Sequence, residues 1–139
     1  MLVKRTMSKN VVSVSVPGNR DKVLDLMRKE KKAVLPVVKG DTDILVGIVT
    51  RSDLINNPDE EQIAMLMSRD LITVAPGDDV IDAARKMMEN DVRRVPVVDD
   101  EGKLVGIITS FDLVSNALTK TEIDDAVENY MINYSTKAQ

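Results

Sequence analysis

The stretches LVGIVTRSDL, at residues 45–54, and LVGIITSFDL, at residues 104–113, are nearly the same decapeptide. A repeat of this kind decides the architecture of a chain before any single residue is considered. The correspondence continues outward through three more pairs of segments: Met7-Ser8 with Met67-Ser68, Pro17-Gly18 with Pro76-Gly77, and Pro36-Val37-Val38 with Pro96-Val97-Val98. The register slips by one residue only near turns, where loops tolerate insertions. Most of the chain is therefore two copies of a unit of about 60 residues.

Hydrophobic spacing predicts how each copy begins. Val12, Val14 and Val16 alternate with serines, as in a half-buried strand, and LITVA at residues 71–75 is the counterpart. A helix is expected to follow at about residues 20–31 in the first copy. The second copy has Asp78 or Asp79 as the helix cap and apolar residues at helical spacing: Val80, Ala83, Ala84, Met87 and Met88.

Each copy continues with two β-branched runs joined by an acidic turn that contains glycine, the pattern of a hairpin. A second helix is expected to begin at Thr50 in the first copy and at Thr109 in the second. The predicted unit is thus strand–helix–strand–strand–helix, which makes the fold class α+β. One such unit buries little surface alone, so we expect two units to pack into one core with pseudo-twofold symmetry.

Composition removes several classes of function. The chain contains no Cys and no His, which excludes disulfides, thiolate or imidazole metal sites and His-dependent catalytic triads. We therefore expect that the protein is not an enzyme. The net charge of −4, with both signs interspersed, disfavours nucleic acid as a partner. No apolar run is long enough to span a membrane and no secretory signal is recognisable, so a cytoplasmic location is expected.

Each decapeptide ends in Thr-x-x-Asp, at Thr50 to Asp53 and at Thr109 to Asp112. One interpretation is a capping box, in which the Thr hydroxyl and the Asp carboxylate satisfy helix amides reciprocally. The other is a ligand-binding corner, in which the Asp accepts hydrogen bonds from ribose hydroxyls. On that interpretation the preceding Gly47 and Gly106 let the backbone approach the ligand closely. The two interpretations do not exclude each other.

The doubled unit resembles a pair of CBS domains, the regulatory Bateman module. The resemblance is carried by TMSKN and LMSRD at the unit starts, by LPVV and VPVV in the middle, and by the Gly-h-h-Thr-x-x-Asp ends at residues 47–53 and 106–112. It implies two pseudo-twofold-related CBS units, each roughly β-α-β-β-α, packed into one Bateman module. We predict unit 1 at residues 1–58, unit 2 at residues 59–118, and a C-terminal helix or tail at residues 119–139.

The resemblance implies a regulatory module that binds an adenosine-containing ligand, of the AMP, ADP, ATP or S-adenosylmethionine class, in clefts between the units. The base would lie against the first strand and the residue runs ending in Pro36 or Pro96, and Arg51 or Arg94 would meet phosphates. No catalytic residue, metal ligand or required cofactor is expected, whereas a homodimer is. The predicted ligand-binding residues are Val12, Ser13, Val34, Pro36, Thr50, Arg51, Asp53, Ile72, Thr73, Arg94, Pro96, Thr109, Ser110 and Asp112.

Other functions stay open at this stage. A structural or oligomerisation scaffold would use both Asp residues only as caps. A Mg²⁺-sensing module would use the acidic turns DTD at 41–43 and DDEG at 99–102, although these lack the ligand spacing of an EF-hand. A nucleic-acid regulator would use the Lys and Arg clusters. The residues do not distinguish one adenosine ligand from another, and they do not identify an effector protein.

The C-terminal tail repeats one more feature of the units. Val3 and Met7 open the first copy, Ile63 and Met67 open the second, and the same spacing recurs at Val127-x-x-x-Met131. A helix is expected to start at Thr121-Glu-Ile-Asp124 and to run to about Met131. Two hypotheses remain open: this helix begins a further unit of a longer array, or it packs on a partner subunit.

Overall fold

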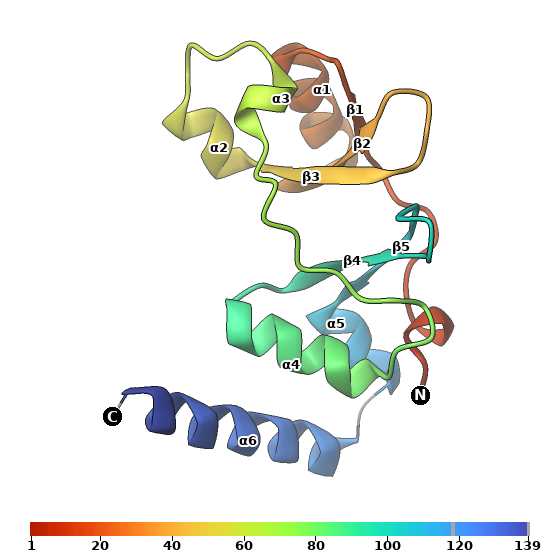
Figure 1. Cartoon of the computed structure of the whole chain (residues 1–139), viewed down its shortest axis with the longest axis vertical. Helices are drawn as coiled ribbons and strands as arrows, with labels where there is room; N and C mark the ends of the chain where they lie inside the picture. Colours follow the sequence, from red (N-terminus) through yellow and green to blue (C-terminus); the bar gives the residue numbers. More distant parts are fainter. Residues whose placement is uncertain (118, 139) are drawn as a thin grey trace. The chain divides into compact units, whose positions relative to one another are not determined.

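The computed structural model describes residues 1–117 and 119–138. The chain forms two compact units (Figure 1). We call residues Asn10–Leu71 with Asp99–Leu104 the N-terminal unit. The remainder, Met1–Lys9 with Ile72–Val98 and the chain from Val105 onward, is the C-terminal unit. Both units combine helices with strands, so the predicted α+β class is confirmed.

The start of each sequence repeat belongs to the compact unit of the other repeat. Residues Met1–Lys9 lie in the C-terminal unit, where Leu2 forms an antiparallel bridge with Asp79 and Ser8 one with Ile107. The beginning of the second repeat lies in the N-terminal unit in the same way, with bridges from Gln62 to Asn19 and from Ser68 to Ile48. The predicted repeat boundaries at residues 58 and 118 stay a prediction. They follow the sequence repeat, whereas the two compact units are defined by contacts in space, which place the start of each repeat with the other one.

A three-stranded sheet forms the N-terminal unit, in the order β1 (Val14–Val16), β2 (Val34–Lys39) and β3 (Leu45–Thr50). β1 runs parallel to β2 and β2 antiparallel to β3, which confirms the predicted hairpin. The helices are α1 (Arg20–Glu30), α2 (Arg51–Asn56) and α3 (Ile63–Leu66). Their apolar side chains pack on the sheet in a single core made of Val14, Val23, Met27, Leu35, Val37, Val49, Leu54, Ile63 and Leu66.

The C-terminal unit repeats this plan with a smaller sheet, β4 (Arg94–Val98) beside β5 (Leu104–Thr109). Its other elements are η1 (Val3–Arg5), α4 (Val80–Asn90), α5 (Ser110–Asp112) and the π-helical turn η2 (Leu113–Ala117). Asp79 caps α4 by accepting a hydrogen bond from the Ile81 amide, so it is the cap of the two candidates. The core consists of Val3, Val74, Val80, Ala83, Ala84, Met87, Val95, Val97, Ile108 and Leu113.

The predicted first strands are shorter than expected. β1 begins at Val14, so Val12 and Ser13 precede it. In the second copy the expected strand at residues 71–75 is reduced to one parallel bridge between Val74 and Val97. The Ala75 amide donates instead to the Asp78 carboxylate, at 2.8 Å, which ends strand pairing there. The alternation of apolar and polar residues correctly predicted that Val14 and Val74 are buried. It did not predict how many residues pair with the neighbouring strand.

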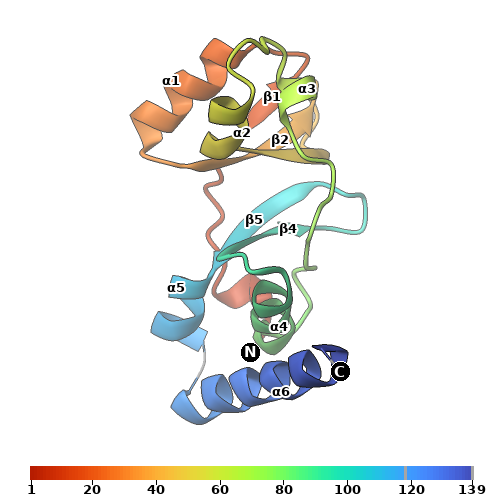
Figure 2. The same ribbon diagram turned by 90° about the vertical axis from the view of Figure 1, so that its left-hand side faces the viewer.

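Helix α6 (Lys120–Ala138) runs beside α4 in both views of the ribbon (Figure 2). It begins earlier than predicted, because Thr119 and Glu122 form its capping box: the Glu122 amide donates to Thr119 Oγ1 and the Thr119 amide to Glu122 Oε1, both at 3.2 Å. Val127 and Met131 are 46% and 54% exposed. Val3 and Ile63, which hold the position of Val127 at the start of the two repeats, are buried. Among the described residues no helix has the length and apolarity to cross a membrane.

Candidate functional site

The strand pairing of the N-terminal unit gathers its predicted ligand-binding residues at one edge of the sheet. Because β1 and β2 are parallel, with Val14 opposite Val37, both strands start at this edge. Because β3 is antiparallel to β2, with Thr50 opposite Val34, β3 ends there. The edge therefore holds Val12 and Ser13 before β1, Val34 and Pro36 in β2, and Thr50, Arg51 and Asp53 after β3.

The C-terminal unit builds the same edge from the second copy. The Val74 amide donates to the Pro96 carbonyl at 3.1 Å, which places Ile72 and Thr73 beside the start of β4. The Ser110 amide donates to the Arg93 carbonyl at 2.9 Å, which joins the end of β5 to the same place. Each set of predicted residues thus lies within one unit: Ile72, Thr73, Arg94, Pro96, Thr109, Ser110 and Asp112 form the second set.

Both Thr-x-x-Asp motifs are capping boxes, which confirms the first interpretation of their spacing. The Thr50 amide donates to Asp53 Oδ2 at 2.8 Å, and the Asp53 amide donates to Thr50 Oγ1 at 3.2 Å. The corresponding distances for Thr109 and Asp112 are 2.9 and 3.1 Å. In each box one carboxylate oxygen, Oδ1, accepts no hydrogen bond within the described part of the chain. A free acceptor therefore stands at each edge.

Cations accompany these acceptors. Arg51 and Arg94 are exposed, and neither forms an ion pair among residues 1–117 and 119–138. Arg51 follows Thr50 directly in the N-terminal unit, whereas Arg94 opens β4 in the C-terminal unit. The two edges therefore carry their arginine at different points. Pro36 and Pro96 are buried, so at each edge they belong to the packed interior and not to the exposed surface.

The two motif glycines have a packing role in the structure, and their expected approach to a ligand stays a prediction. A Cβ on Gly47 would stand 2.6 Å from Sδ of Met67, and a Cβ on Gly106 would stand 2.6 Å from Sδ of Met7. The space above each glycine is therefore filled by a methionine of the Met-Ser pair that opens a repeat. Glycine is needed there for packing within the unit, because any larger residue would collide with that side chain.

One polar contact at the edge of the C-terminal unit was not predicted from the sequence. Lys86, in the middle of α4, is half-buried, and its Nζ donates a hydrogen bond to the Thr73 carbonyl at 2.6 Å. The corresponding helix position in the first copy is Leu26. A lysine where the other repeat has an inward leucine is the signal that could have drawn attention to this position.

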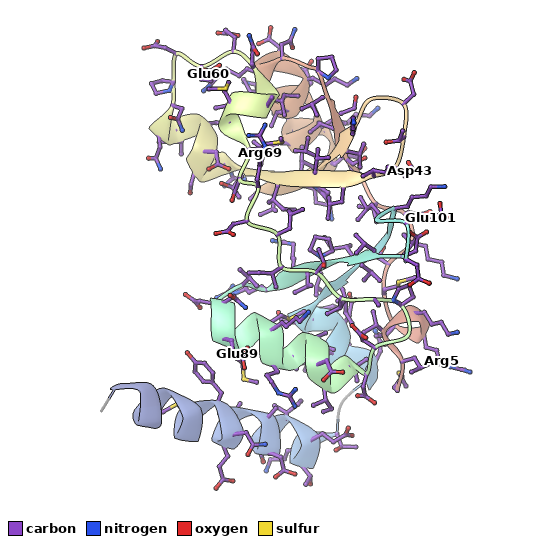
Figure 3. All side chains as sticks on the ribbon, viewed as in Figure 1. Arg5, Asp43, Glu60, Arg69, Glu89 and Glu101 are labelled. Atoms are coloured by element: carbon purple, nitrogen blue, oxygen red, sulfur yellow. The ribbon has the colours of Figure 1, made fainter. Side chains whose placement is uncertain are left out.

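The acidic turns have a structural explanation. The Leu104 amide donates to the Asp43 carbonyl at 2.8 Å, and the Leu45 amide donates to the Gly102 carbonyl at 3.1 Å, so the two turns pair with each other. Asp43 and Glu101 stand at these turns (Figure 3). The Glu101 carboxylate pairs with Lys103 at 3.0 Å. No group of three or more potential metal-ligating side chains occurs among the described residues.

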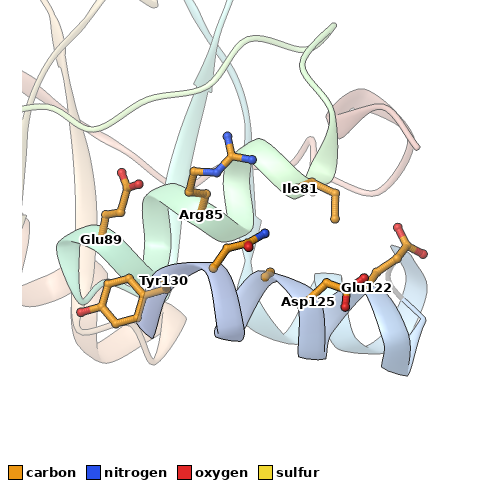
Figure 4. A pocket seen from close by; sticks show the side chains of 8 residues that line it. Ile81, Arg85, Glu89, Glu122, Asp125 and Tyr130 are labelled. Carbon is orange, nitrogen blue, oxygen red and sulfur yellow. The ribbon is translucent and has the colours of Figure 1, made fainter. Parts of the chain in front are cut away.

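A groove of about 210 Å³ lies between α4 and α6 (Figure 4). Arg85 and Glu89 line it from α4, and Glu122, Asp125 and Tyr130 line it from α6. A second, apolar groove of about 120 Å³ involves Ser110 together with α4, η2 and α6 residues. Apart from Ser110, these grooves contain none of the predicted ligand-binding residues.

The family model for the CBS domain matches the chain twice, at residues 3–60 and at residues 61–118. The chain belongs to the CBS-domain family and carries a tandem CBS pair, as its sequence motifs predicted. The uncharacterized protein MJ0188 of Methanocaldococcus jannaschii is 29% identical over 133 residues, which cover 92% of this chain and 49% of that protein. Inosine-5'-monophosphate dehydrogenase of Thermoplasma acidophilum is 39% identical over 90 residues, 65% of this chain and 18% of that enzyme.

Solved CBS pairs have the same fold. CBSX2, crystallised in complex with AMP, superposes with a TM-score of 0.74 at 31% identity, covering 84% of this chain and 95% of that one. The CBS domain pair of MJ0100, in complex with 5'-methylthioadenosine and S-adenosyl-L-methionine, gives a TM-score of 0.73 at 31% identity, covering 82% and 93%. By contrast, the chain spans about half or less of the length of the curated relatives that it matches.

Proposed function

We propose that this tandem CBS pair is a regulatory module that senses an adenosine-containing ligand at the two sheet edges. The observation that carries the proposal is the free Oδ1 of Asp53 and of Asp112, held in fixed position by a capping box beside an open strand start. A carboxylate oxygen so placed suits the vicinal hydroxyls of a ribose. The AMP, 5'-methylthioadenosine and S-adenosyl-L-methionine complexes of similar CBS pairs support the same class of ligand.

The other predicted residues have consistent roles in this proposal. Val12 with Ser13, and Ile72 with Thr73, would contact the base through half-buried apolar atoms and backbone groups. Arg51 and Arg94 would bind phosphate, because an unpaired guanidinium offers two parallel donors to phosphate oxygens. Their different positions favour two unequal sites. A ligand acts as a signal only if it binds one conformation of the protein better than another.

The decisive experiment is thermal unfolding of the full chain with AMP, ADP, ATP and S-adenosylmethionine in turn. A ligand at one hundred times its dissociation constant stabilises the folded state by about 2.7 kcal/mol. Asp53→Ala and Asp112→Ala should remove this gain at their own edge. Asp79→Ala is the matched control, because it also removes a helix-capping carboxylate but one that lies outside both predicted sets. If no ligand raises the unfolding temperature of the wild type, the sensor proposal fails.

A scaffold is the second candidate, and one observation favours it: both Asp carboxylates already serve as caps. A scaffold predicts that Asp53→Ala and Asp112→Ala lower stability as any cap loss does, by about 0.5–2 kcal/mol, without any effect of ligand. The two candidates are therefore distinguished by the ligand response of the wild type and not by the cost of the substitutions.

We extend the proposal to a cytoplasmic homodimer. Exposed apolar side chains on helical elements support self-association: Phe111 is 73% exposed, Ile55 69% and Met65 68%. Such residues favour burial against a second copy. Sedimentation analysis of the wild type and of Phe111→Ser should give a dimer for the first and more monomer for the second. A monomeric wild type at micromolar concentration would overturn this part.

A further inference from the structure

The segment Ile72–Ala75 contributes Ile72 and Thr73 to the edge of the C-terminal unit. It is held by one backbone bridge and two hydrogen bonds to side chains instead of a continuous strand ladder. Val74 forms the one backbone bridge, through its amide to Pro96 and its carbonyl to the Val98 amide at 2.9 Å. On either side of Val74 the backbone forms its hydrogen bond with a charged side chain. The Asp78 carboxylate accepts from the Ala75 amide at 2.8 Å, and the Lys86 ammonium donates to the Thr73 carbonyl at 2.6 Å.

The first copy holds the equivalent segment in another way. β1 pairs with β2 over three positions, from Val14 to Val16, and the Gly40 amide donates to the Val16 carbonyl at 2.7 Å. The position that matches Lys86 is Leu26, which packs against the apolar core of the N-terminal unit together with Val12. The first copy therefore contains no counterpart of the link from Lys86 to Thr73.

The surroundings of Lys86 make its hydrogen bond specific. Its neighbours on α4 include the buried Ala83 and Met87, and its ammonium reaches the Thr73 carbonyl at 2.6 Å. A half-buried ammonium is costly unless it is hydrogen-bonded, and a bond from a charged donor is stronger than one between neutral groups. The Thr73 carbonyl is the partner that Lys86 has, and it lies 13 residues away in the sequence.

We propose that Lys86 is a positioning residue, which fixes the backbone at Thr73 and thereby sets the affinity of the C-terminal unit for its ligand. This inference rests on the proposed function. The Thr73 carbonyl lies in the same peptide plane as the Val74 amide, which donates to Pro96, so the bond from Lys86 is the second hydrogen bond that holds this plane and the groups that a base would contact. A segment that is ordered before binding loses less conformational entropy when the ligand binds, so the ligand binds more tightly.

The test compares Lys86→Met, which keeps the stem but removes the donor, with Lys86→Arg, which keeps a charged donor. Leu26→Met is the matched control at the equivalent position of the other copy. All are made in the full chain, and AMP and S-adenosylmethionine are the probes for calorimetric titration. We expect Lys86→Met to weaken binding at the Asp112-dependent site by about five- to tenfold, and Lys86→Arg to restore most of it. Leu26→Met should leave that site unchanged.

Hydrogen exchange provides a readout that needs no ligand. In Lys86→Met the amides of Val74 and Ala75 should exchange faster than in the wild type, while those of Val14 and Ser15 should not change. If Lys86→Met binds both probes as the wild type does, or if exchange at Val74 and Ala75 is unaltered, the positioning role is wrong. If the wild type itself binds neither probe, the proposed function fails, and the exchange result alone decides whether Lys86 fixes the segment.

Discussion

The two compact units are built from the same repeat, yet they hold their first segment by different means. In the N-terminal unit β1 joins β2 through a ladder of three paired residues. In the C-terminal unit a single bridge at Val74 is supplemented by the side chains of Asp78 and Lys86. The comparison teaches that a duplicated topology survives when backbone pairing is replaced by side-chain bonds, and that such replacements are where the two copies can diverge in function.

Other features are the same in both units. Each places a methionine over the glycine of its β3 or β5 strand, at the same 2.6 Å from where a Cβ would be. Each has a capping box after that strand, and each ends its long helix on a residue with left-handed backbone, Lys31 at φ 54° and Asp91 at φ 51°. These shared features set the plan of the unit, and substitutions in them should act alike in both halves.

The largest effect is expected from Gly47→Ala and Gly106→Ala. Each added Cβ would collide with a methionine and would lie 3.0 Å from the backbone oxygen of Ser68 or Ser8, so it overpacks the unit. We expect a loss of about 1–3 kcal/mol in the free energy of unfolding, measured by urea denaturation. The double variant Gly47→Ala with Met67→Ala should lose less than the two single losses added together. A negligible loss in one half only would break the equivalence of the two units.

Arg20 distinguishes the halves next. Its guanidinium donates to the carbonyls of Leu54 at 2.9 Å and Asn57 at 2.8 Å, and thus holds the end of α2, whereas the counterpart Val80 is buried in the core. Arg20→Met should lower the free energy of unfolding by about 1–2 kcal/mol. Arg20→Lys should recover little, because an ammonium lacks the planar fork that reaches two carbonyls. Full recovery by lysine would show that charge alone matters at this position.

A smaller effect is expected at the helix caps. The hydrogen bond from the Ile81 amide lowers the pKa of the Asp79 carboxyl. The ionised Asp79 carboxylate therefore stabilises the folded state fully at neutral pH, and this stabilisation is lost as the pH falls through the lowered pKa. Asp79→Ala should cost about 1 kcal/mol at pH 7 and Asp79→Asn less, since asparagine also caps helices. The difference between the wild type and Asp79→Asn should shrink in acid.

The matched control for Asp79 is its counterpart in the other half. Asn19 occupies the cap position of α1 but makes no side-chain capping hydrogen bond. Asn19→Ala should therefore change stability less than Asp79→Ala under the same conditions. Equal losses at the two positions would mean that the cap bond to Ile81 is not what stabilises α4.

The smallest expected effect concerns the helix ends and has the opposite sign. Lys31→Gly should raise the free energy of unfolding by about 0.5–1 kcal/mol, because glycine adopts the left-handed backbone without steric cost. Asp91→Gly should gain less, since aspartate enters that region more readily than lysine. Chemical denaturation of the two variants side by side measures the difference. A loss on either substitution would indicate that the side chain itself contributes at that helix end.

The sequence predicted those parts of the site that depend on short separations along the chain. Thr50 and Asp53 are three residues apart, and that spacing is sufficient to predict a capping box. At the C-terminal tail the expected helix start, Thr121 with Asp124, is wrong: Thr119 and Glu122 form the capping box. Local spacing predicted the kind of contact there but not the residues that make it.

The sequence by itself determined the duplication, the α+β class, the long helices with their buried faces, and the family, because periodicity and motif order are properties of neighbouring residues. Only the tertiary structure decided that Met67 fills the space over Gly47, that residues 1–9 belong with the second repeat, and that Lys86 reaches Thr73. Each of these contacts joins residues from different elements. Their formation depends on how side chains fill a common core, and no local pattern encodes that.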